Sequence, residues 1–89
     1  MNSDVENFII QFSGEDCQRL ARKLLLHRDQ AKLEPLIREL SELMVGKAST
    51  CEKIAAPMIH QHWPKGERSD EEVRWIADTY AKYFNELSC

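Results

Sequence analysis

The sequence contains little glycine and little proline, with three residues of each among 89. The glycines, Gly14, Gly46 and Gly66, are far apart, so the chain has no glycine-rich loop that could cradle a phosphate group. No run of apolar residues approaches the ~20 that a membrane-spanning helix requires. We therefore expect a soluble protein without a phosphate-binding loop and with no membrane segment.

Cysteine is also scarce, and its pattern argues against a disulfide framework. Cys17, Cys51 and Cys89 are odd in number and lack framework spacing, which is typical of reduced thiols. The stretch that follows Met1 has no basic segment leading into an apolar one, so it does not have the form of a secretory signal. We therefore predict a complete small protein located in the cytoplasm.

Metal-binding residue types come close together in one stretch, where Cys51, His60 and His62 fall within twelve residues. At about 100° per residue, His60 and His62 point about 200° apart on a helix, so they would not converge on one ion. The chain contains neither a Cys-x-x-Cys nor a His-x-x-x-His motif. We predict no metal site and no cofactor, with His62 at the edge of the apolar face and His60 in solvent.

Two cysteines occupy positions where a helix N-terminus could lower the pKa of a catalytic thiol. Cys17 and Cys51 both fall in the first turn of a predicted helix. Both also lie on apolar faces, so we interpret them as core residues rather than nucleophiles. The carboxylates of residues 70–72 begin the last predicted helix, where the helix dipole explains them. We therefore predict no catalytic residues and no enzymatic activity.

The sequence contains a signal for the start of a helix that recurs four times. A serine precedes a carboxylate by three positions four times, which is the spacing of a capping box. These pairs are Ser3 with Glu6, Ser13 with Asp16, Ser49 with Glu52, and Ser69 with Glu72. Four such signals in 89 residues predict an all-α fold. There is neither an internal repeat nor a linker, so we predict one domain. It would be a compact single-domain bundle of four to five short amphipathic helices over residues 1–89.

Apolar residues between these signals recur with the spacing of an amphipathic helix. The four apolar faces consist of Val5, Phe8, Ile9 and Phe12; Cys17, Leu20, Ala21 and Leu24; Leu33, Leu36, Ile37, Leu40, Leu43 and Met44; and Val73, Ile76, Ala77, Tyr80, Phe84 and Leu87. The third helix is expected to begin near residues 32–34, because Pro35 is tolerated only in a first turn. It is expected to end at Gly46.

A proline interrupts the fourth predicted helix, which extends from Thr50 to about His62. Proline inside a helix costs ~3 kcal/mol unless the helix bends, so we expect this helix to be kinked or broken at Pro57. Residues 62–69 contain Pro64 and Gly66 between charges. This composition predicts the main exposed loop.

The stretch RLARKLLLHR, residues 19–28, concentrates positive charge in a chain whose formal net charge is −3. On a helical projection, Arg19, Arg22 and Lys23 lie between about 140° and 240° from the centre of the apolar face, and Leu26 lies among them. We call Arg19, Arg22, Lys23 and Leu26 the basic face. An apolar anchor within a charged rim is typical of a protein–protein interface.

Three further apolar side chains extend this interpretation. Trp75 falls about 200° from the start of the last apolar face, Ile10 lies off the first apolar face, and Trp63 lies in the predicted loop. Tryptophan is strongly enriched at binding hot spots. We therefore predict a small regulator, either an adaptor, an anti-activator or a stoichiometric inhibitor of the phage or plasmid type, that binds an acidic and apolar surface of another protein. A symmetric patch around Leu26 or Trp75 would instead make a homodimer.

Two functions related to nucleic acid are the alternatives. The second and third predicted helices could form a helix-turn-helix, but the third one carries Glu34, Glu39 and Glu42, whereas a DNA groove requires cations and amides. We therefore do not expect direct binding of nucleic acid. An acidic mimic of nucleic acid would need its carboxylates on one face, and the excess of 15 acidic over 12 basic residues is small. Those carboxylates are Glu34, Glu39, Glu42, Asp70, Glu71, Glu72 and Asp78.

Overall fold

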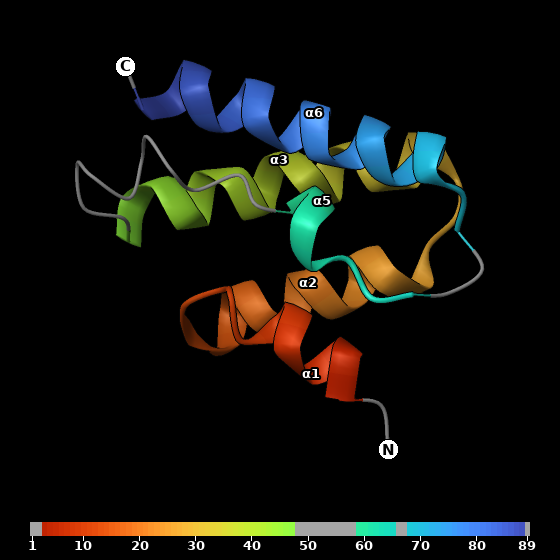
Figure 1. Cartoon of the computed structure of the whole chain (residues 1–89). Helices are drawn as coiled ribbons and strands as arrows, with labels where there is room; N and C mark the ends of the chain where they lie inside the picture. Colours follow the sequence, from red (N-terminus) through yellow and green to blue (C-terminus); the bar gives the residue numbers. More distant parts are fainter. Residues whose placement is uncertain (1–2, 48–58, 66–67, 89) are drawn as a thin grey trace.

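The computed structural model describes residues 3–47, 59–65 and 68–88, and within these ranges it contains five helices and no strand. The helices are α1 (Ser3–Ile9), α2 (Gly14–Leu26), α3 (Gln30–Lys47), α5 (Ile59–His62) and α6 (Asp70–Ser88) (Figure 1). The Cα radius of gyration of 12.1 Å is about the value of a compact chain of this length. The predicted all-α fold is confirmed.

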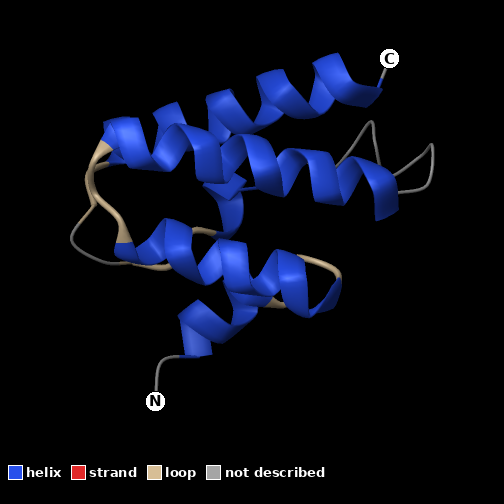
Figure 2. Cartoon of the chain, turned by 180° about the vertical axis from the view of Figure 1, so that it is seen from behind, coloured by secondary structure: helices blue, strands red, loops and turns tan. Residues whose placement is uncertain are grey.

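The two longest helices, α3 and α6, lie side by side and form the most extensive helix contact. On the other side of the molecule α2 packs on α3, and α1 packs on α2 (Figures 1 and 2). The short helix α5 lies between α1 and α6 and contacts both of them. None of the described helices combines the length and the apolar character that a membrane-spanning helix requires.

The core is built from the predicted apolar faces. Its buried side chains are Phe8, Ile9, Phe12, Cys17, Leu20, Ala21, Leu24, Leu33, Ile37, Leu40, Ile59, Val73, Ile76, Ala77, Tyr80 and Phe84. Leu36, Leu43 and Met44 are half-buried at its edge. Leu87 was predicted on the last apolar face but is 43% exposed, because it lies in the final turn of α6 beyond the packed part of that helix.

The helix starts follow the capping prediction in part. At α6, the Glu72 amide donates to Ser69 Oγ at 3.3 Å, so Ser69 is the predicted N-cap. The Glu72 carboxylate accepts from the Ser69 hydroxyl at 3.4 Å, whereas a full capping box would have it accept from the Ser69 amide. At α2, Ser13 makes no side-chain cap; Asp16 Oδ1 instead accepts from the Cys17 amide at 2.8 Å. The pair Ser49–Glu52 lies outside the described residues, and so does Pro57, where we predicted a kink.

The start of α3 differs from the prediction. The helix begins at Gln30 rather than near residues 32–34, because Asp29 provides an N-cap: its Oδ1 accepts from the Ala31 amide at 3.0 Å. Pro35 therefore lies inside the helix, where it removes one backbone hydrogen bond. The other end was predicted at Gly46, and the helix continues one residue further, to Lys47.

The segment after α5 is more buried than its composition predicted. Pro64 is buried, and the Arg68 side chain is only 6% exposed. Arg68 Nη2 donates to the carbonyl oxygens of Leu24, at 3.3 Å, and of His27. These carbonyls lie at the C-terminal end of α2, so the guanidinium satisfies backbone acceptors there and joins α2 to the start of α6.

Candidate functional site

The second helix, α2, separates an apolar face from a charged one. Cys17, Leu20, Ala21 and Leu24 are buried, as the helical spacing predicts. Arg19, Arg22 and Lys23 are all exposed on the other side. Arg19 and Lys23 have no ion-pair partner among the described residues. The basic face therefore presents its cations to solvent.

Leu26 is the last residue of α2 and is 77% exposed, more than any other large apolar side chain that the structure describes. It lies one helical turn beyond Arg22 and Lys23, so its side chain adjoins both of theirs. The helical projection predicted this position. The fourth member of the basic face is therefore an apolar side chain in water.

A second exposed apolar side chain directly follows the neighbouring helix α1. Ile10 is 64% exposed, and its amide donates to the Glu6 carbonyl, so it lies one turn beyond Glu6. Glu6 Oε1 in turn lies 3.5 Å from Arg22 Nη1. Both groups are about half exposed, so this ion pair adds little stability. It does link α1 to Arg22 of the basic face.

The two tryptophans are half-buried, which differs from the exposed positions that the sequence predicted. Trp63 is half-buried and packs edge-on against Phe8, with ring centroids 5.1 Å apart. The Arg68 guanidinium lies 5.5 Å from the centroid of the Trp63 ring. Trp75 is also half-buried and packs against the core. Both residues contribute to packing, so neither supports the predicted surface as an exposed hot spot.

The thiol of Cys17 is fully buried, and burial raises its pKa. A raised pKa is the opposite of what a nucleophilic thiol requires. Cys51 and Cys89 lie outside the described residues. Cys17 is therefore a core residue in this structure, as its position on the apolar face predicts.

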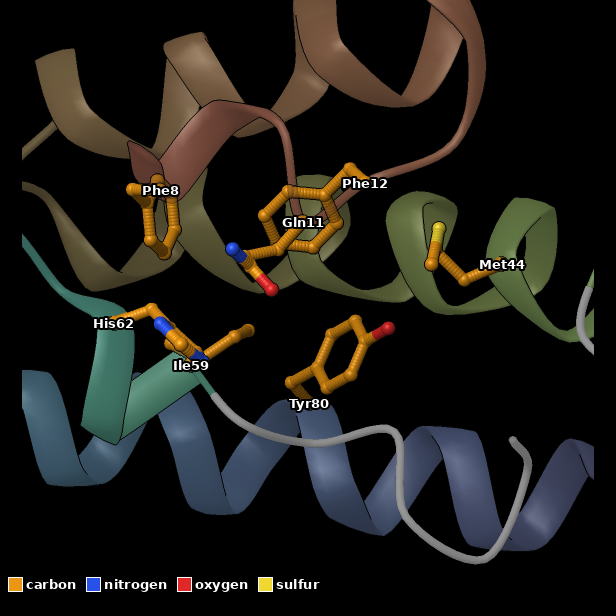
Figure 3. A pocket seen from close by; sticks show the side chains of 7 residues that line it. All are labelled: Phe8, Gln11, Phe12, Met44, Ile59, His62 and Tyr80. Atoms are coloured by element: carbon orange, nitrogen blue, oxygen red, sulfur yellow. The ribbon is translucent and has the colours of Figure 1, made fainter. Parts of the chain in front are cut away.

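The described ranges contain no group of three or more His, Cys, Asp and Glu residues that could hold a metal ion. His60 is exposed and His62 is half-buried, as the sequence predicts. His62 lines a small cavity with Phe8, Gln11, Phe12, Met44, Ile59 and Tyr80 (Figure 3). The cavity has a volume of about 20 Å³, which accommodates about one water molecule. This cavity is therefore too small for an organic ligand.

The carboxylates that a nucleic-acid mimic would use are partly engaged within the protein. Glu34 accepts a hydrogen bond from the Tyr83 hydroxyl at 2.9 Å, which raises the pKa of that tyrosine. Glu42 lies 3.4 Å from Arg38 on the same helix. The exposed side of α3 thus carries both signs of charge, which gives no support to its use as a recognition helix.

Comparisons of the chain with protein-family models, with curated proteins and with solved structures find no significant match. The basic face therefore stands on its own geometry as the candidate site. Leu26 and the three cations carry it, without the two tryptophans.

Proposed function

We propose that this chain is a small regulator without enzymatic activity that binds another protein through the basic face of α2. The observation that carries the proposal is the exposed position of Leu26 beside Arg22 and Lys23. The partner surface would be acidic, with an apolar recess that receives the leucine. Binding of this kind would make the chain an adaptor, an anti-activator or a stoichiometric inhibitor.

The two chemical components of the basic face support different parts of such an interaction. Burying a leucine side chain fully contributes about 1.5–3 kcal/mol. Cations around it accelerate association with an acidic surface and disfavour wrong partners, more than they add affinity. A grip on nucleic-acid phosphates would use the cations but would have no need for the leucine.

The experiment is a comparative pull-down from the native cell with three versions of the chain. One is unchanged, one carries Arg19→Glu, Arg22→Glu and Lys23→Glu, and one carries three matched charge reversals elsewhere. The matched set is Lys32→Glu, Arg74→Glu and Lys65→Glu, all at exposed positions outside α2. Both variants change the net charge equally, so only the location of the change differs.

We expect the unchanged chain and the matched variant to recover the same protein, and the basic-face variant to lose it. Equal recovery by all three versions would show that the basic face is only a solvated helix surface. Loss from both variants would show that total charge, rather than this face, drives capture. If the basic-face variant alone loses bound nucleic acid rather than a protein, the helix-turn-helix alternative gains support instead.

Self-association has a separate test in solution. We expect light scattering after size exclusion to give the mass of one chain, 10.4 kDa. A dimer that Leu26→Asp dissociates would identify a second copy of this chain as the partner and would contradict the proposed binding of a different protein.

A further inference from the structure

The exposed side of α2 carries two neighbouring rows of side chains. Residues four apart on a helix line up along its surface as a ridge, and a groove separates one ridge from the next. One ridge, which we call the Glu15 row, consists of Glu15, Arg19 and Lys23. The next, which we call the Gln18 row, consists of Gln18, Arg22 and Leu26. The basic face is therefore divided between two rows that border one groove.

A hollow of about 390 Å³ lies along this groove. It is lined by Glu15, Gln18, Arg19 and Arg22, which are two residues from each row. At 1.5 Å per residue, the rows extend about 17 Å from Glu15 to Leu26, or about three helical turns. The two rows contribute far fewer side chains than the roughly 20–30 residues that each partner brings to a standard protein interface. The groove therefore suits a single secondary-structure element.

The Gln18 row is fixed against α1 and the connection that follows it. Gln18 Nε2 donates to the carbonyl oxygen of Phe12 at 3.0 Å. Arg22 Nη1 lies 3.5 Å from Glu6 Oε1 on α1. Leu26, at the end of this row, stays 77% exposed. The Gln18 row is thus a supported border of the groove that ends in an apolar side chain.

The cations of the Glu15 row are not paired within the part of the chain that the structure describes. Arg19 and Lys23 are exposed, and neither has an ion-pair partner there. Glu15, the only carboxylate among the residues that line the hollow, begins the row. Along α2 the groove therefore presents first a negative charge, then cations, and finally the apolar side chain of Leu26.

We propose that this groove binds a single acidic amphipathic helix of the partner, which runs antiparallel to α2. One row of side chains on such a helix fits between the two rows of α2, as ridges fit into grooves where helices pack. Its carboxylates pair with Arg19 and Lys23, and two apolar side chains one turn apart enclose Leu26. This inference rests on the function proposed above and specifies which element of the partner is bound.

The order of the groups along α2 determines the direction of the bound helix. In the antiparallel arrangement, the helix has its carboxylates nearer its own N-terminus and a cation opposite Glu15 nearer its C-terminus. The dipole of the bound helix favours both positions. A parallel helix would need the cation first and the carboxylates later, which its dipole disfavours. The antiparallel arrangement is therefore the more stable one.

A designed peptide tests the groove by NMR titration of the folded, isotope-labelled chain at low ionic strength, where charges are little screened. The probe is the end-capped peptide ALQALAQEAQAEAQKA, which consists of good helix formers. Its leucines lie opposite Leu26, its first glutamate opposite Lys23 and its second opposite Arg19. We expect saturable shifts of the amides of these three residues, with a dissociation constant of about 1 mM.

Three control probes separate the contributions to binding. ALQALAQQAQAQAQKA lacks the carboxylates, so it is expected to bind at least about threefold more weakly. AAQAAAQEAQAEAQKA lacks the leucines, so it is expected to bind at least about tenfold more weakly. A short DNA duplex carries negative charge without an apolar row, and it is expected to cause no saturable shift of the same amides.

An exchange of charges assigns the pairs and the direction of the helix. Arg19→Glu is expected to weaken binding of the probe at least about threefold, and ALQALAQEAQAKAQKA, in which lysine replaces the second glutamate, is expected to restore it. Lys23→Glu is expected to be restored instead by ALQALAQKAQAEAQKA, in which lysine replaces the first glutamate. The matched reversal Arg74→Glu, at an exposed position of α6, is expected to leave binding unchanged. Restored binding cannot arise from misfolding.

The inference is overturned if the probe causes no saturable shift of these amides, or if the neutral peptide or the DNA duplex binds as tightly as the probe. It is also overturned if neither exchange restores binding, and restoration in the opposite pairing would show a parallel helix instead. Shifts of the same amides that depend only on the concentration of the chain would identify a second copy as the occupant.

The pull-down described above tests the proposed function separately. If the basic-face variant loses a protein but the probe does not bind, the basic face binds a surface other than a helix. This inference then fails, and the proposed function stands. If the probe binds but the basic-face variant recovers the same proteins as the unchanged chain, the proposed function fails, whereas the preference of the groove for an acidic helix stands.

Discussion

Leu24 and Leu26 lie two residues apart on α2, yet Leu24 is completely buried and Leu26 is 77% exposed. The two side chains point to opposite sides of the helix, one into the core and the other beside Arg22 and Lys23. The same residue type therefore serves stability at one position and remains available for binding at the other.

This contrast predicts opposite results for two truncations. Leu24→Ala is expected to lower the free energy of unfolding by about 2–5 kcal/mol, because it leaves a cavity in the core. Leu26→Ala is expected to change it by no more than about 0.5 kcal/mol, because the side chain is already in water. Urea unfolding followed by circular dichroism measures both. A large loss of stability in Leu26→Ala would show that this leucine is part of the packed structure.

Gly14 and Gly46, the two glycines that the structure describes, predict opposite effects of an alanine substitution on stability. Gly14 has φ of +85°, where any side chain is strained, so Gly14→Ala is expected to destabilise the protein by about 1–2 kcal/mol. Gly46 lies inside α3, and a Cβ there would meet nothing within 4 Å. Gly46→Ala is therefore expected to stabilise the protein by about 0.5–1 kcal/mol. Thermal unfolding checks the sign of each change, and equal signs would contradict the backbone assignment at Gly14.

Truncation of Arg68 is expected to destabilise the protein more than truncation of an exposed arginine does. Arg68→Ala leaves the carbonyls of Leu24 and His27 without this donor, so a loss of about 1–3 kcal/mol is expected. Arg38→Ala removes only an exposed pair with Glu42 on the same helix, which contributes about 0.5 kcal/mol or less. Chemical unfolding of the two variants compares them directly. Similar losses would mean that Arg68 does not secure the end of α2.

The ion pair between Asp16 and Lys47 predicts a dependence of stability on pH. Lys47 Nζ lies 2.6 Å from Asp16 Oδ1, and this hydrogen bond is the main cause of the lowered pKa of Asp16. Because the folded pKa lies below the unfolded one, the stabilisation is present above about pH 4 and is lost as the pH falls through the folded pKa. Asp16→Asn is therefore expected to be less stable than the unchanged chain at pH 6, with a difference that shrinks towards pH 2.

The measurement is the midpoint of urea unfolding at several pH values, with Glu15→Gln as an exposed control from the same turn. The control is expected to follow the unchanged chain more closely than Asp16→Asn does. A difference between Asp16→Asn and the unchanged chain that stays constant down to pH 2 would contradict the role of the ionised carboxylate.

Most of the fold was predictable because its signals are local. Apolar spacing placed Cys17, Leu20 and Leu24 on one side of a helix, and Ser69 with Glu72 marked the start of another. The start of α3 was predicted wrongly. The prediction placed Pro35 in the first turn of the helix and did not consider the N-cap that Asp29 provides. An N-cap side chain determined the first turn, and the helix accommodated the proline six residues later.

The candidate site was predictable only where it depends on one helix. Leu26 is exposed because of its angle on α2, and that angle follows from the sequence. The burial of Trp63 depends on Phe8, which is far away along the chain, so no local pattern indicates it. The role of Arg68 depends likewise on carbonyls of another helix, and the sequence shows only a cation in a polar stretch.

The most direct test of the central proposal is photo-crosslinking in the native cell from position 26. A benzophenone-bearing residue replaces Leu26 in one version and the exposed Arg74 on α6 in the control. We expect one adduct of defined mass from position 26, none from position 74, and loss of the adduct when Arg19, Arg22 and Lys23 are reversed in charge. No adduct from position 26, or the same adducts from both positions, would contradict it.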